Sequence, residues 1–227
     1  MDDSKWARWS ALGGVVFVAL SLLSGFLPGS PAKTSDSATK IAKFINDNRS
    51  SIRWAGYVGV LAVVALFWFL GAVWRFLRDA EGGVPRLTVV AVTGAVFAAV
   101  TSTIAGIVLG AIGILGVGGS GGANGVRFFY VLSFNIGAAT TLGAAVFIGA
   151  FSVVIIRSRV LAPWLGWIGV LIAVVLVVSG AAVASTRDVF FDLSFGGFLA
   201  FSLWLLVVSI MMFMRMGEPS VGAVSTS

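Results

Sequence analysis

The stretch LTVVAVTGAVFAAVTSTIAGIVLGAIGIL, Leu87–Leu115, decides the fold class because it is apolar and carries no charged residue. It is too long for a buried strand and lacks the alternation of a half-buried one. About 20 helical residues cross the hydrocarbon core of a bilayer, and a helix satisfies its own backbone hydrogen bonds there. The stretch therefore predicts a membrane-spanning helix.

Similar apolar runs lie on both sides of this stretch, and they suggest one membrane domain over residues 1–227. Hydrophobic residues make up 59% of the chain and charged residues 11%, which is a membrane composition. The predicted spans lie near residues 9–27, 54–74, 87–115, 131–156, 160–184 and 189–214. We therefore expect an all-α integral membrane protein, a six-transmembrane-helix bundle, with a flexible C-terminal tail at 216–227.

One sizeable polar segment, residues 28–53, separates the first two spans. Its apolar positions at helical spacing are Ala38, Ile41, Ala42 and Ile45. This spacing predicts a short amphipathic helix in the first outer loop, with Ser35 or Asp36 as its N-cap. We expect the helix to rest on the bundle or on lipid headgroups, and the alternative is a lid or lipid-binding element.

The stretch GVGGSGGANG, Gly116–Gly125, contains the G-x-G-x-x-G spacing of a dinucleotide-binding turn. That motif needs a preceding strand and a following acidic residue, but apolar runs flank it and no acidic residue lies between Glu81 and Asp188. We therefore expect no nucleotide, and a flexible outer connection between two helices. The basic residues lie scattered at the ends of apolar runs, which indicates membrane topology and no nucleic acid partner.

The chain contains no cysteine and no histidine. Their absence excludes disulfides, thiolate and imidazole metal sites, and a Ser-His-Asp arrangement. The cores of the predicted spans also carry no ionisable residue, which disfavours ion-coupled transport. The sequence therefore predicts no catalytic residue, no metal and no cofactor.

Small residues recur on the third and fourth spans, where they let helix axes approach closely. The positions expected to pack in this way are Gly106, Gly110, Gly113, Gly137, Thr141, Ala145 and Gly149. We expect these two spans to form a tightly packed antiparallel pair. A glycine-lined permeation path is the alternative interpretation.

Four polar residues are expected at the outer ends of spans four and six: Arg127, Asn135, Asp188 and Asp192. Asp192 is predicted to pair with Arg127 and to form, with Asn135, a polar pocket for a lipid headgroup or a polar group of a partner. The alternative is that the acidic residues only favour the N-terminus of their helix.

The basic residues of the short loops orient the chain. With both termini in the cytoplasm of a bacterial cell, the inner face of the plasma membrane carries Lys5, Arg8, Arg75, Arg78, Arg86, Arg157, Arg159 and Arg215. The outer face carries Arg127, Arg187 and the five basic residues of the first loop, where a small folded element tolerates charges. This bias predicts cytoplasmic N- and C-termini in a multi-pass protein of the plasma (inner) membrane.

Three segments resemble uncharacterised actinobacterial membrane proteins related to the DUF4386 group: SDSATKIAKFINDNRSSI (Ser35–Ile52), LFWFLGAVWRFLRDAEGG (Leu66–Gly83) and RSRVLAPWLGWIGVL (Arg157–Leu171). The resemblance implies the same six-span layout. It implies no established activity and transfers no site residue.

These observations favour a non-enzymatic accessory or structural membrane protein. Its expected partners are membrane lipids, a partner membrane protein or further copies of the same chain. The alternative is a passive channel or carrier for a small neutral or apolar molecule or a lipid.

Overall fold

The computed structural model describes residues 3–183 and 188–215, and the regular elements of these residues are helices. Six of them are long and apolar enough to cross a membrane, which confirms the predicted six-helix membrane bundle. In chain order the elements are α1 (Asp3–Phe26), α2 (Ala38–Asp47), α3 (Arg49–Glu81), α4 (Arg86–Gly119), α5 (Gly122–Ser158), α6 (Pro163–Ser179), the 3-10 helix η1 (Gly180–Val183) and α7 (Asp188–Arg215). The predicted tail at 216–227 lies outside the described residues.

The spanning helices extend beyond their apolar runs. α5 has 37 residues, which corresponds to about 55 Å at helical rise, whereas the hydrocarbon core of a bilayer is about 30 Å thick. The helix therefore begins well before the predicted span at 131–156. Apolar runs mark the part of a helix that lipid can surround, but local hydrogen bonds and caps decide where the helix ends.

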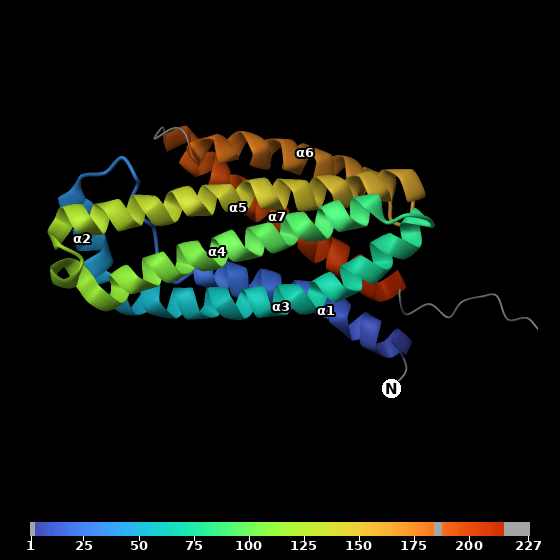
Figure 1. Ribbon diagram of the computed structural model, residues 1–227, viewed down its shortest axis with the longest axis horizontal. Helices are drawn as coiled ribbons and strands as arrows, with labels where there is room; N and C mark the ends of the chain where they lie inside the picture. The colour runs from blue at the N-terminus through green and yellow to red at the C-terminus, as the bar shows by residue number, and fades with distance from the viewer. Residues whose placement is uncertain (1–2, 184–187, 216–227) are drawn as a thin grey trace, which may run out of the picture.

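The contacts between the six long helices close them into a ring. We describe the ring by its two ends, which lie at the left and right of Figure 1. Each helix packs against the next in the order α1, α3, α4, α5, α6 and α7, and α7 returns to pack on α1. The α2 end holds α2 and the start of α5, and the opposite end holds the start of α4. The most extensive interface joins α4 and α5, which confirms the predicted antiparallel pairing of the third and fourth spans.

The half of the ring away from α2 is filled by buried aromatic side chains. Phe69 and Phe151 are fully buried, and Phe147 is only 1% exposed. The ring of Phe151 lies edge-on to Phe147 and Trp204, with ring centres 5.8 and 5.5 Å apart. The indole N–H of Trp204 donates to the carbonyl of Leu165 at 2.9 Å. This aromatic core holds α3, α5, α6 and α7 together.

The closest approach of α4 and α5 lies at Gly94 and Gly143. A Cβ atom on Gly94 would lie 2.8 Å from the backbone nitrogen of Phe147. A Cβ atom on Gly143 would lie 2.8 Å from the backbone nitrogen of Ala98 and from the carbonyl oxygen of Gly94. The two backbones touch because neither residue has a side chain, as small residues permit in membrane bundles.

The glycines that the sequence assigned to this contact lie elsewhere, which corrects the prediction. A Cβ atom on Gly106, Gly110 or Gly137 would meet no atom within 4 Å, and one on Gly113 would meet α3. Gly106 and Gly137 instead border a cavity between the helices. The physical reason is that the α4 and α5 backbones touch nearer the opposite end of the ring and leave open space beside these glycines.

The other predicted packing positions on α5 have three different surroundings. Thr141 lines the same cavity. Ala145 is 4% exposed within the packed core. A Cβ atom on Gly149 would lie 3.6 Å from Ala173, so this glycine faces α6. These positions therefore do not form one common face toward α4.

α2 is the predicted amphipathic helix, and it packs on α4 and α5 at one end of the ring. Ser37 is its N-cap, one residue beyond the predicted position, and its hydroxyl accepts from the backbone N–H of Lys40 at 3.3 Å. The buried cluster beneath α2 comprises Ala32, Ile41, Ala42, Ile45, Ile52, Ile112, Val126 and Tyr130. The helix rests on the bundle, as the apolar spacing predicts.

The glycine-rich connection is shorter and more helical than the sequence suggests. α4 continues to Gly119 and α5 begins at Gly122, so only Ser120 and Gly121 lie between them. Gly116 interrupts α4 with a φ of 66°, a left-handed value that favours glycine. The expected open loop is therefore mostly helix, with a break at Gly116 and a two-residue junction at Ser120 and Gly121.

The side chain of Arg49, at the start of α3, binds the end of α4 before this break. Its Nε donates to the carbonyl of Gly113 at 3.1 Å, and its Nη2 donates to the carbonyl of Ile114 at 2.7 Å. A break at Gly116 leaves such carbonyls without their partners in the helix. The guanidinium satisfies them and fixes α4 to α3 at the α2 end.

Candidate functional site

A cavity of about 1210 Å³ occupies the half of the ring nearest α2. Residues of all six long helices line it, together with η1 and the connection between α1 and α2. Ligand pockets for drug-sized molecules usually measure about 300 to 1,000 Å³. The cavity is therefore large enough for a ligand bigger than most small metabolites.

The aromatic core forms the floor of the cavity. Leu66 and Phe147 belong to both the cavity wall and the packed core. Phe69 and Phe151 lie in the core and are not among the cavity-lining residues. The cavity is thus a pocket on one side of this core.

Three hydroxyl groups of the wall already have hydrogen-bond acceptors in the protein. Ser102 and Thr103 both donate to the carbonyl of Ala99, at 3.0 and 2.8 Å. Ser24 on α1 donates to the carbonyl of Ala55 on α3 at 2.8 Å. Since their donors are satisfied, these residues demand no polar group from a ligand. The wall suits an apolar molecule.

A strap, which we define as residues 28–34 of the connection between α1 and α2, borders the cavity at the α2 end. The phenol of Tyr130 donates to the carbonyl of Ala32 at 2.5 Å, and Ala32 is buried beneath α2. This contact ties the strap to α5.

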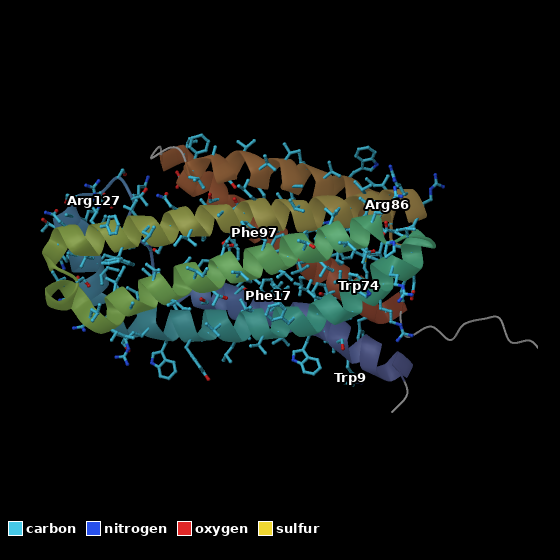
Figure 2. The ribbon with its side chains drawn as sticks, in the orientation of Figure 1. Trp9, Phe17, Trp74, Arg86, Phe97 and Arg127 are labelled. Carbon is cyan, nitrogen blue, oxygen red and sulfur yellow. The ribbon has the colours of Figure 1, made fainter. Side chains whose placement is uncertain are left out.

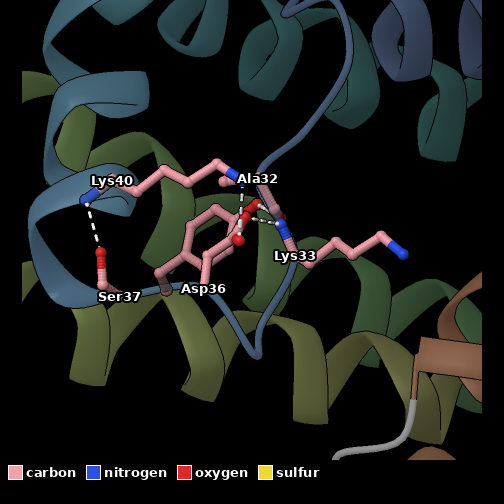
Figure 3. Close-up of polar contacts among 6 residues, drawn as sticks. Ala32, Lys33, Asp36, Ser37 and Lys40 are labelled. Carbon is pink, nitrogen blue, oxygen red and sulfur yellow. Dashed lines mark hydrogen bonds and ion pairs between the residues drawn. The ribbon is translucent and has the colours of Figure 1, made fainter.

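Asp36 fixes the chain between the strap and α2. Its carboxylate accepts from the ammonium of Lys40 at 2.8 Å and from the backbone N–H of Lys33 at 2.9 Å (Figure 3). The hydrogen bond from Lys40, followed by that from Lys33, holds the pKa of Asp36 below its ordinary value. Asp36 is therefore ionised at neutral pH and keeps both contacts.

Two of the four predicted polar-pocket residues, Asn135 and Asp192, line the cavity and are exposed. Arg127 is exposed at the α2 end of α5 and is not a lining residue (Figure 2). It lies about two turns, or about 12 Å, from Asn135 along the helix. Asp188 begins α7, but its side chain lies outside the described residues.

The predicted ion pair between Arg127 and Asp192 is not formed. Both ion pairs among the described residues lie around α2, and they join Lys40 to Asp36 and Lys43 to Asp47. Arg127 stands too far toward the end of α5 to face the cavity with Asn135. This corrects the predicted pairing and leaves Asn135 and Asp192 as the shared polar feature.

Sequence reasoning missed the cavity itself. Its signal is the concentration of glycine, alanine, serine and threonine on α3, α4 and α5, which the sequence interpretation assigned to helix contact. The alternative of a glycine-lined path comes closer, because Gly106 and Gly137 border the cavity. Small residues permit close packing and open space equally, so composition alone does not separate the two.

The acidic residues provide no metal-binding cluster in the part of the chain that the structure describes, where no three His, Cys, Asp or Glu side chains gather. Comparison with protein-family models, with curated proteins and with solved structures gave no match. The cavity, with Asn135 and Asp192 in its wall, is therefore the candidate functional site.

Proposed function

We propose that this protein is a non-enzymatic membrane protein that holds a lipid in the cavity between its helices, as an accessory or structural component of the membrane. The observation that carries the proposal is the cavity of about 1210 Å³, with a mainly apolar wall in which the hydroxyls of Ser24, Ser102 and Thr103 are hydrogen-bonded within the protein. Acyl chains match such a wall because they require no hydrogen bonds.

Packing energetics support an occupant for this space. Atoms that line a void lack van der Waals partners on one side. A lipid that enters between the helices supplies the missing contacts, so the ring gains stability when it is filled.

The alternative is a passive channel or carrier for a small neutral or apolar molecule. Such a molecule would have to pass the aromatic core, where Phe69, Phe147 and Phe151 are at most 1% exposed. Tight packing there resists local opening, since close-packed cores have few voids. Burial of these rings favours lipid binding over conduction.

Purification in a mild detergent, followed by lipid extraction and mass spectrometry, tests the proposal. We expect a stoichiometric lipid to remain bound through extensive washing. A copurifying partner membrane protein would add support for the accessory role. Protein that retains no lipid, yet moves a neutral solute across liposome membranes, would contradict lipid binding and favour the channel.

We also propose that the chain lies in a bacterial plasma membrane with both termini in the cytoplasm, as the basic short loops indicate. Ser37 and Ser158 are exposed near opposite ends of the ring, and the chain has no native cysteine. In Ser37→Cys and Ser158→Cys variants, an impermeant maleimide added to intact cells should label position 37 and leave position 158 unlabelled. The reverse pattern would invert the orientation.

A further inference from the structure

Two charged residues lie in the wall of the cavity. Among its described lining residues the charged side chains are Lys33 in the strap and Asp192 on α7. Both come from the α2 end of the ring, because Lys33 lies ahead of α2 and Asp192 lies near the start of α7. Deeper parts of the wall are mainly apolar and uncharged, so this end of the cavity has the electrostatic character of a headgroup site.

Asp192 and Asn135 have no partner among the described residues. Neither side chain takes part in an ion pair or hydrogen bond there. Both are exposed and both line the cavity, Asn135 from α5 and Asp192 from α7. An ionised carboxylate only accepts hydrogen bonds, and an amide offers one acceptor oxygen and two N–H donors. A ligand that occupies the cavity and carries N–H donors can pair with these acceptors in place of water.

We propose that the α2 end of the cavity, at Asn135 and Asp192, selects a zwitterionic phospholipid with a primary ammonium group, of the phosphatidylethanolamine type. This proposal rests on the proposed function and adds the class of headgroup. The ammonium donates to the carboxylate of Asp192 and to the amide oxygen of Asn135. Charge-assisted hydrogen bonds of this kind are about twice as strong as neutral ones.

Other common headgroups match these residues less well. A choline headgroup carries a quaternary ammonium without N–H donors, so it leaves the acceptors of Asp192 and Asn135 unsatisfied. An anionic glycerol headgroup has no ammonium group to pair with the carboxylate of Asp192. A soluble amine lacks the acyl chains that fill the apolar wall. The ligand is therefore a lipid.

The test is a competition among lipids with identical acyl chains. Purified full-length protein is exchanged with an equal mixture of phosphatidylethanolamine, phosphatidylcholine and phosphatidylglycerol, and the bound lipids are quantified by mass spectrometry. We expect phosphatidylethanolamine to be enriched roughly tenfold, the factor that corresponds to one charge-assisted hydrogen bond. Asp192→Asn should abolish the enrichment while the total amount of bound lipid stays unchanged.

The matched control is Asp79→Asn, which removes the same charge from an exposed carboxylate near the end of α3, at the opposite end of the ring. The control should keep the full enrichment of phosphatidylethanolamine. Asp192→Glu keeps the carboxylate and should retain part of the enrichment that Asp192→Asn loses. Thermal unfolding of each variant verifies that the fold is retained.

Two results would overturn the headgroup proposal and leave lipid binding intact: equal binding of the three lipids by the parent protein, or unchanged enrichment in Asp192→Asn. Displacement of bound lipid by free phosphoethanolamine would identify a soluble ligand and overturn the lipid source. Retention of no lipid of any class would contradict the proposed function itself.

Discussion

Replacing Gly143 by leucine is expected to lower the free energy of unfolding by about 3 kcal/mol, the upper part of the usual range for overpacking. The new Cβ atom would lie 2.8 Å from the backbone nitrogen of Ala98 and from the carbonyl oxygen of Gly94. A backbone moves less readily than the tip of a side chain, so α4 and α5 must separate. Thermal unfolding in detergent measures the loss.

Gly71→Leu is the matched control, because Gly71 is exposed on α3 and its Cβ atom would meet nothing within 4 Å. Its unfolding temperature should stay close to that of the parent. Gly106→Leu should also be tolerated, because a Cβ atom at this position meets nothing within 4 Å. From the sequence alone, Gly106 and Gly110 form a GxxxG pattern and would be expected to lie at a close helix contact. If Gly143→Leu unfolded at the parent temperature, the close approach at this position would be wrong.

Filling the cavity is expected to reduce lipid retention about tenfold or more, equivalent to at least 1.4 kcal/mol. The variant combines Gly106→Phe and Gly137→Phe, since both glycines border the cavity and both have open space around their Cβ positions. Two aromatic side chains would occupy the volume that acyl chains need. Stability should not fall, because both side chains enter open space and phenylalanine is a better helix former than glycine.

Gly71→Phe provides the same chemical change on the exposed face of α3, outside the cavity lining. Its lipid content should match that of the parent, measured by extraction and mass spectrometry after identical washing. Full lipid retention in the double cavity variant would show that any bound lipid lies on the outer surface of the bundle, which contradicts the proposed site.

The candidate site was partly accessible from the sequence. Asn135 and Asp192 stand out as polar residues near the ends of apolar runs, and the structure brings both to one cavity. Arg127 has the same appearance in the sequence, yet it lies about 12 Å further along α5 and does not join them. The position of a residue along one helix can be counted, but the relative depth of residues on separate helices depends on how the helices pack.

The sequence by itself determined the six spanning helices and the buried face of α2. Both follow from local rules: a bilayer requires about 20 apolar residues that satisfy their own backbone, and Ile41 and Ile45 share a face because a helix turns every 3.6 residues. Such rules involve only residues close in the chain. They hold whatever the neighbouring helices do.

Only the tertiary structure decided which small residues touch and which surround a space. Gly94 and Gly143 meet another backbone, whereas Gly106 and Gly137 border the cavity, although all four are glycines within long apolar helices. The missing side chain permits contact but supplies no force toward it, because lipid offers no hydrophobic drive for helices to associate. The outcome depends on where the whole ring of helices converges, and this is fixed by bulky residues such as Phe147 and Phe151 in the opposite half.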